Sequence, residues 1–207
     1  MTPEEFAART NVSRETLANF VVYQQLLEKT QERLNLVGPS TLADLWNRHF
    51  FDSAQLRPLI PKGARRLIDL GSGAGFPGMV LALLDPHLEV HLIEGNRHKA
   101  GFLAELARAT GRARQVTIHA ARIANVTAKL AGTADVVTAR ALTELEELLG
   151  LAAPLLNKTG IAIFPKGAKA EAELTRAVKK WTMRAERIPS QSDPSGTIFR
   201  ISDLVRK

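Results

Sequence analysis

The sequence predicts an α/β fold built around a mostly parallel β-sheet. From residue 66 onward, apolar runs typical of strands alternate with segments of helical spacing, and the expected strands are 66–70, 89–94, 115–119, 135–139 and 160–165. Such alternation indicates parallel strands with helices on both faces of the sheet. The chain then changes pattern, because Met183–Ile188 and Thr197–Leu204 are strand-like with no helix between them. These two runs predict an antiparallel hairpin and a total of seven strands.

The helices are predicted from apolar spacing and from capping residues. Between the strands they are expected near 77–84, 97–110, 122–130, 143–156 and 168–180. The first 60 residues read as helical: Thr2-Pro3-Glu4-Glu5 forms a capping box, Ser13 can cap a second helix, and a third helix begins near Ser40. We therefore expect an N-terminal helical extension, residues 1–60, packed on a main domain, residues 61–207.

Composition limits the classes of protein that the chain can represent. The chain has 207 residues, 45% of them hydrophobic, and no cysteine, so disulfides and thiolate chemistry are excluded. No apolar run reaches the roughly 18 residues of a membrane span, and we expect a cytoplasmic monomer without membrane contact. The formal net charge of +7 favours a polyanionic partner, nucleic acid first, although a merely basic enzyme would fit as well.

A glycine-rich stretch follows the first predicted strand and marks the candidate ligand site. Leu67–Leu70 runs directly into Gly71-Ser72-Gly73-Ala74-Gly75, and an apolar helical pattern begins after Pro77-Gly78. Glycines at alternate positions allow a tight turn and a close approach of backbone to ligand. A helix start supplies unpaired N–H groups. The stretch therefore predicts a nucleotide-type pocket at the carboxyl end of the first strand.

Two acidic residues indicate which nucleotide the pocket takes. Asp69 ends the first strand and Glu94 ends the second. A pyrophosphate would meet unfavourable charge here, whereas S-adenosylmethionine carries a sulfonium and an amine, and Glu94 could bind its ribose hydroxyls. We therefore assign Asp69, Gly71, Gly73 and Glu94 to S-adenosylmethionine. The alternatives are a helix-capping or turn role for Asp69 and a solvated strand end for Glu94.

The same features narrow the fold class. A parallel sheet that ends in an antiparallel pair is the methyltransferase variant of the doubly wound fold. Dinucleotide-binding domains usually continue with parallel strands and a substrate domain, for which little chain is left. The sequence therefore predicts a Rossmann-like class I S-adenosylmethionine-dependent methyltransferase fold.

Several motifs in the same order resemble one family. They are Asn35-Leu36, Arg48-His49 with Asp52-Ser53, the run Ile68–Gly78, Lys99 with Phe102-Leu103, Arg140-Ala141 and Lys166-Gly167. With these motifs the chain resembles, over nearly its whole length, the RsmG (glucose-inhibited division protein B) family of 16S rRNA methyltransferases. The resemblance implies methyl transfer from S-adenosylmethionine to a guanine N7 in the 530 loop, on naked 16S rRNA or within the small subunit or its precursor.

The resemblance also implies cofactor contacts at Gly71, Phe76, the pair Ile123-Ala124 and Arg140. Two departures from the family pattern stand out. Relatives usually carry an acidic residue where this chain has Ala124, and they often carry Arg-His before the last strand, where this chain has Thr197-Ile198. A backbone contact at Ala124 would preserve adenine binding, whereas a required carboxylate would be lost.

The candidate substrate contacts are basic. Guanine N7 has a free lone pair and no proton, so we assign neither a catalytic base nor a metal. The residues expected to hold guanine or phosphate are Arg48, His49, Lys99 and Lys166, with Arg140 at the pocket itself. Arg48 and Asp52 lie at i, i+4 spacing, which suits either a surface ion pair or a phosphate-contacting edge. His49 could be a core residue and Lys166 a solvated strand end.

Other functions share part of this pattern. A methyltransferase of another RNA or of a small molecule would have the same cofactor site, but small-molecule enzymes usually have an apolar lid, and only 5% of this chain is aromatic. A nucleotide-dependent oxidoreductase would place pyrophosphate near Asp69. A non-catalytic RNA-binding module would not need both Asp69 and Glu94.

Overall fold

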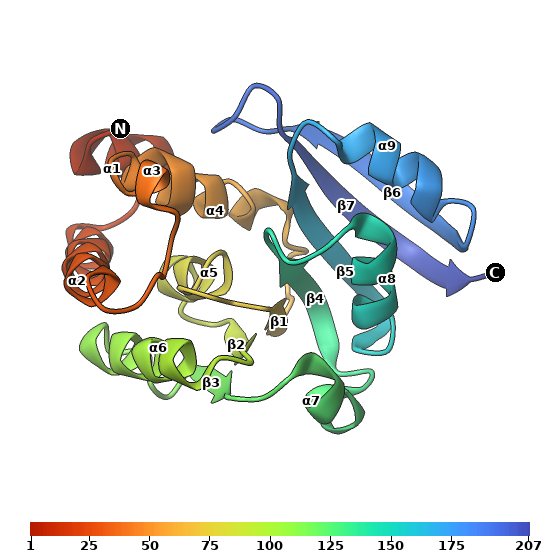
Figure 1. Ribbon diagram of the computed structural model, residues 1–207, viewed down its shortest axis with the longest axis horizontal. Helices are drawn as coiled ribbons and strands as arrows, with labels where there is room; N and C mark the ends of the chain where they lie inside the picture. The colour runs from red at the N-terminus through yellow and green to blue at the C-terminus, as the bar shows by residue number, and fades with distance from the viewer.

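The computed structural model describes residues 1–207 and contains one seven-stranded sheet in the order β3-β2-β1-β4-β5-β7-β6 (Figure 1). The strands are β1 (Arg66–Leu70), β2 (Glu89–Ile93), β3 (Val116–His119), β4 (Ala134–Ala139), β5 (Leu156–Lys166), β6 (Trp181–Pro189) and β7 (Thr197–Arg206). Strands β1 to β5 are parallel, while β7 is antiparallel to both β5 and β6. The predicted fold class and the C-terminal hairpin are confirmed.

The helices follow the predicted alternation. They are α1 (Pro3–Thr10), α2 (Arg14–Gln31), α3 (Pro39–Leu42), α4 (Asp52–Ala54), α5 (Gly78–Leu84), α6 (Arg97–Ala109), α7 (Ile123–Leu130), α8 (Leu145–Ala152) and α9 (Ala170–Ala177), with a π-helical segment at Trp46–Phe51 and a 3₁₀ turn at Arg57–Leu59. The capping box at Thr2 and the cap at Ser13 are both present. None of the helices combines the length and apolarity needed to cross a membrane.

Two expectations about element bounds were wrong. The expected helix 143–156 ends at Ala152, because Pro154 follows and β5 already begins at Leu156. The third N-terminal helix is not continuous: α3 ends at Leu42, and a π-helical segment then leads into α4. In this segment the Asp52 N–H donates to the Asn47 carbonyl, five residues earlier, as in other π-helical turns.

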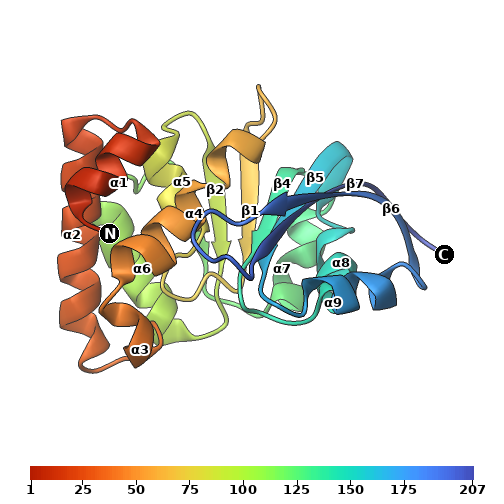
Figure 2. The same cartoon turned by 90° about the horizontal axis from the view of Figure 1, so that it is seen from above.

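The sheet separates two apolar cores, because successive residues of a strand point to opposite faces. Leu67 packs in the core beneath α2, α5 and α6, whereas its neighbour Ile68 packs beneath α7, α8 and α9. Figure 2 shows these two helical layers on either side of the sheet. The N-terminal helices lie in the first layer, so residues from both halves of the chain share one core.

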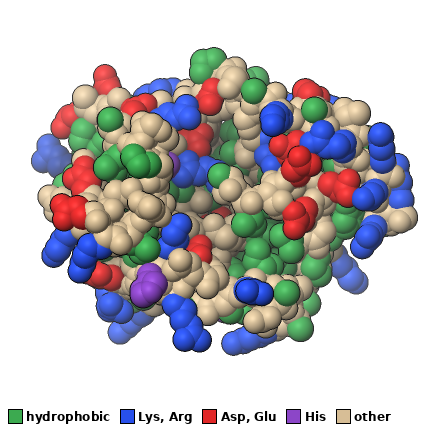
Figure 3. Space-filling view, viewed as in Figure 1, with side chains coloured by type: hydrophobic (Ala, Val, Ile, Leu, Met, Phe, Trp, Pro, Cys, Tyr) green, Lys and Arg blue, Asp and Glu red, His purple; other side chains and the backbone are tan.

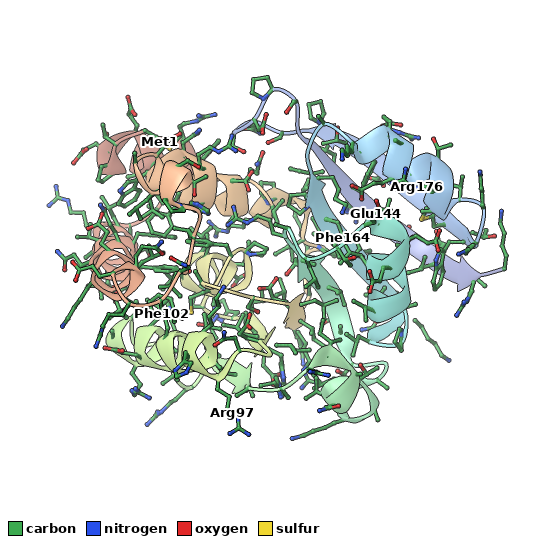
Figure 4. All side chains as sticks on the ribbon, viewed as in Figure 1. Met1, Arg97, Phe102, Glu144, Phe164 and Arg176 are labelled. Atoms are coloured by element: carbon green, nitrogen blue, oxygen red, sulfur yellow. The ribbon has the colours of Figure 1, made fainter.

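An aromatic cluster joins the N-terminal helices to the glycine-rich loop. The ring of Phe50 is fully buried, and its centroid lies 5.2 Å from that of Phe20, 5.1 Å from that of Tyr23 and 5.8 Å from that of Phe76. Figure 4 shows Phe102 reaching from α6 toward the same side, while Arg97 points away from the body of the protein. The wall of the ligand site at Phe76 is therefore continuous with the N-terminal core.

Phe50→Ala should destabilise the whole protein rather than its first 60 residues alone. Removing a fully buried phenylalanine ring costs about 3–5 kcal/mol, and the shared core should transmit this loss to the sheet. Urea unfolding followed by tryptophan fluorescence and by circular dichroism should show one transition with a lowered midpoint. Val205→Ala, at a side chain that is 62% exposed, is the matched control. Separate transitions for the two probes would contradict a common core.

Candidate functional site

A cavity of about 920 Å³ opens at the carboxyl ends of the parallel strands. It lies where the strand order reverses, between β1 and β4, which is where ligands bind in open α/β sheets. The segments that follow β1, β2, β4 and β5 line it, together with the π-helical segment and the β6–β7 loop. Figure 3 shows basic and acidic side chains meeting near the middle of this face.

The glycine-rich loop forms the floor of this cavity. Gly71 and Gly73 both have a left-handed backbone, with φ of +63° and +57°. A Cβ on Gly71 would lie 2.7 Å from Leu142 Cδ1, whereas a Cβ on Gly73 would have no atom closer than 3.8 Å. Glycine is favoured at position 71 mainly by this left-handed backbone, because the Leu142 side chain is exposed and flexible. Gly73 leaves open space on the cavity side for a closely approaching ligand.

Asp69 lies beneath the loop and does not line the cavity. Its side chain is fully buried; the Thr138 hydroxyl donates to Oδ1 over 2.7 Å, and the Gly78 N–H donates to Oδ2 over 3.3 Å. Burial raises the pKa of Asp69 to about 6, although these donors favour the ionised form. The capping role left open by the sequence is thus present, since Gly78 begins α5. A direct contact of Asp69 with a cofactor stays a prediction.

Glu94 lines the cavity and holds the loop from the other side. The N–H of Gly73 donates to Oε2 over 2.8 Å, and the N–H of Asn96 donates to Oε1 over 2.7 Å. The carboxylate is only 9% exposed, so it is held in one orientation by these bonds. Each oxygen can accept a further hydrogen bond. A ligand with two neighbouring hydroxyl groups would suit such an acceptor.

Arg140 connects the end of β4 with the N-terminal helices. Its guanidinium donates to Asp52 Oδ2 over 3.1 Å, to the Arg48 carbonyl over 3.0 Å and to His49 Nδ1 over 2.6 Å. The guanidinium carbon also lies 5.0 Å from the centre of the Phe76 ring. The surface ion pair between Arg48 and Asp52, one of the two roles that their spacing suited, is absent: Asp52 pairs with Arg140, and Arg48 pairs with Asp193 over 3.5 Å.

His49 lines the cavity but does not offer a positive charge. Burial, together with the neighbouring charges of Arg140 and Arg48, lowers the pKa of His49 to about 3. The ring is therefore neutral at physiological pH, with Nδ1 accepting from Arg140 and Nε2 donating to Thr41 Oγ1 over 2.8 Å. Its position favours orientation of Arg140 over attraction of a phosphate.

The lysines and the α7 residues differ in how freely they can reach a ligand. Lys166 lines the cavity, but its ammonium lies 2.7 Å from Glu173 Oε2 and donates to the Thr143 carbonyl. Lys99 lines the cavity and forms no ion pair. Ile123 at the start of α7 lines it as well, whereas Ala124 is exposed outside the lining.

The strand-end residues Arg140 and Lys166 do face one cavity, as their positions after neighbouring strands predicted. Thr197 and Ile198, where relatives often have Arg-His, lie in the same lining. No group of three or more His, Asp or Glu side chains is arranged to hold a metal ion.

Tyr23, which supports the glycine-rich loop from beneath without lining the cavity, was not identified from the sequence. Its hydroxyl donates to the Ala74 carbonyl over 2.5 Å, and its ring stacks on Phe76 with a centroid distance of 5.3 Å and an interplanar angle of 6°. A signal existed, because Tyr23 is the chain's one tyrosine and lies on an apolar helix stripe, where a buried hydroxyl needs an acceptor. The sequence could not show that the acceptor is the glycine-rich loop.

Two of the solved structures with a similar fold are O-methyltransferases. The chain aligns with the O-methyltransferase TomG from Streptomyces achromogenes, solved in complex with SAM, with a TM-score of 0.60 at 14% identity, covering 92% of this chain and 90% of that one. It also aligns with the O-methyltransferase from Bacillus cereus, solved in complex with SAH, with a TM-score of 0.60 at 12% identity, covering 88% and 91%. These likenesses show the class I methyltransferase fold.

Sequence relatives are much closer. The chain is 53% identical to a ribosomal RNA small subunit methyltransferase G of Rhodospirillum centenum over 97% of this chain and 90% of the relative. It is 51% identical to the protein of that name from Paramagnetospirillum magneticum, covering 100% and 98%. The GidB family model, described as rRNA small subunit methyltransferase G, matches residues 16–195. The resemblance seen in the motifs is thereby confirmed: the chain belongs to the GidB family of small-subunit rRNA methyltransferases.

Proposed function

We propose that this protein transfers a methyl group from S-adenosylmethionine to N7 of a guanine in the 530 loop of 16S rRNA. The observation that carries the proposal is the cavity at the strand-order reversal, which combines the glycine-rich loop, Glu94 and Arg140 in a member of an rRNA methyltransferase family. The substrate is 16S rRNA, either free or already part of the small subunit or its precursor. The net charge of +7 suits such a polyanion.

The lining residues fit S-adenosylmethionine better than a dinucleotide. Glu94 would accept from the ribose hydroxyls, and its negative charge disfavours a pyrophosphate at the same place. Gly71 and Gly73 would give the backbone access, while Phe76 and Ile123 would provide apolar contact. The first turn of α7 has N–H groups without helical partners, so the Ala124 backbone could bind an adenine edge without a carboxylate. Asp69 would support the site by holding both ends of the loop, in addition to its predicted contact with the cofactor.

The chemistry requires little beyond positioning. When bound, S-adenosylmethionine supplies a methyl group on a positively charged sulfur. Guanine N7 attacks through its own lone pair, so no side chain has to remove a proton. Correct orientation of the two reactants can lower the barrier by roughly 7–11 kcal/mol. Arg140 would hold guanine O6, a phosphate or the cofactor's carboxylate, while Arg48, Lys99 and Lys166 would contact the RNA around it.

A methylation assay on unmodified RNA tests this function directly. Purified protein would be incubated with labelled S-adenosylmethionine and either 16S rRNA or small subunits from a strain that lacks the enzyme. We expect label at N7 of one guanine in the 530 loop, located by nuclease digestion and mass spectrometry. Incorporation at another base, or into neither substrate, would contradict the proposal.

Gly73→Ala should weaken cofactor binding. The added Cβ would occupy the open space at the loop, and we expect the affinity for S-adenosylmethionine in calorimetry to fall at least tenfold. Gly111→Ala is the matched control, because Gly111 has a φ of +68° and no atom within 4 Å of an added Cβ. Both variants carry similar left-handed strain, of about 1–2 kcal/mol. Equal affinities in the two variants would exclude contact between Gly73 and the cofactor.

Arg140→Ala should lower methyl transfer more than tenfold, equivalent to about 1.4 kcal/mol or more. The change also leaves Asp52 without its partner, so the free energy of unfolding should fall by about 1–3 kcal/mol. Asp52→Asn breaks the same ion pair but keeps the guanidinium. It should lose comparable stability and keep activity within about threefold of the wild type. If Asp52→Asn loses as much activity as Arg140→Ala, the arginine is structural.

A further inference from the structure

A second, smaller cavity of about 220 Å³ lies on the other side of the π-helical segment and α4. Two arginines line it, Arg9 from α1 and Arg57 from the 3₁₀ turn, together with Gln55 and Gln191. No aspartate or glutamate is part of the lining. The cavity therefore combines cationic and amide donors without an internal counter-charge.

Both arginines are available to a ligand. Each is exposed, and neither guanidinium forms an ion pair or a side-chain hydrogen bond. Arg140 differs, because its guanidinium already forms three hydrogen bonds within the protein. The Arg9 guanidinium lies 3.8 Å above the centre of the Phe51 ring, which restrains it against the surface and leaves its edge donors free. A preorganised guanidinium suits a tetrahedral oxyanion such as phosphate.

The two cavities are separated by one helical segment and one loop. Arg48 and Asp52 line the large cavity, while Phe51 and Gln55 of the same segment line the small one. In the β6–β7 loop, the flanking serines Ser190 and Ser192 line the large cavity and Gln191 lines the small one.

Hydrogen bonds fix the loop against the helix. Gln55 Nε2 donates to Ser190 Oγ and Ser192 Oγ over 3.1 and 3.0 Å, and the Gln191 N–H donates to Gln55 Oε1 over 2.7 Å. These bonds therefore fix the position of one cavity relative to the other.

We propose that the small cavity binds a backbone phosphate of the RNA substrate, on the strand next to the nucleotide that enters the large cavity. This inference rests on the proposed function and adds a binding site to it. Arg9 and Arg57 would hold the phosphate oxygens, with the Gln191 amide as a further donor. An RNA strand that crosses the β6–β7 loop would contact both sites. The small cavity would thereby fix the direction in which the strand leaves the methylation site.

The test compares Arg9→Gln/Arg57→Gln with a control that removes the same charge elsewhere. Arg108→Gln/Arg114→Gln changes two exposed arginines that line neither cavity. Binding of an RNA fragment containing the 530 loop would be measured over a range of salt concentrations. We expect the first variant to bind at least fivefold more weakly, with a salt slope smaller by about 0.7 for one lost phosphate contact on a single strand. S-adenosylmethionine affinity should be unchanged in both variants.

A third variant and two further measurements distinguish RNA binding from poor folding, from binding of a free anion and from failure of the proposed function. Gln191→Glu adds a carboxylate to the cavity at an exposed loop position and should weaken RNA binding in the same direction, even if the double variant folds poorly. RNA affinity and salt slope equal to wild type in the cavity variants would overturn the proposal.

If inorganic phosphate stabilises the wild type but not the double variant while RNA binding is unchanged, the site serves a free anion instead. Failure of the wild type to methylate 16S rRNA would refute the proposed function alone, because the RNA-binding comparison does not depend on catalysis.

Discussion

The buried carboxylate of Asp69 is the constraint on which the site depends. It accepts hydrogen bonds from Thr138 on β4 and from Gly78 at the start of α5, and it belongs to β1 itself. Three elements are therefore joined at one point, and the glycine-rich loop is closed between residues 69 and 78. Burying a carboxylate is costly unless donors surround it, and its raised pKa reflects that cost. These hydrogen bonds fix the loop where the strand order reverses, and Gly71 and Gly73 leave the floor of the cavity free of side chains at their positions.

The N-terminal helices complete this site rather than merely cover it. Tyr23 contacts the loop at Ala74 and Phe76, and Asp52 and His49 hold the guanidinium of Arg140. The parallel strands supply the floor of the cavity, and the π-helical segment supplies one wall. The negative charge of Asp52 partly compensates the positive charge of Arg140, because His49 is neutral. The hydrogen bonds to both residues fix the orientation of the guanidinium. Such preorganisation suits a reaction that needs orientation more than proton transfer.

The sequence predicted the sheet and most of the cavity floor, because both depend on local patterns. Strand alternation, the glycine run and the strand-end positions of Glu94, Arg140 and Lys166 follow from chain order and from the rule that parallel strands share one edge. Contacts across long sequence separations were not predictable. The partner of Asp52 lies 88 residues away, at Arg140, and Arg48 pairs with Asp193, 145 residues away. The burial of Asp69 and the lowered pKa of His49 likewise depend on neighbours that only the folded chain brings together.

The hydrogen bonds between Gln55 and the β6–β7 loop have a consequence for the order in which the protein acquires its shape. They join segments about 135 residues apart in the sequence. During synthesis, the N-terminal helices and the first strands leave the ribosome well before the loop that closes the cavity. Contacts of such long range form late, since the chain between them must first be ordered. The surface formed by α4 and the β6–β7 loop should therefore be completed last. A nascent chain would have its first strands and its glycine-rich loop in place before it could bind a substrate.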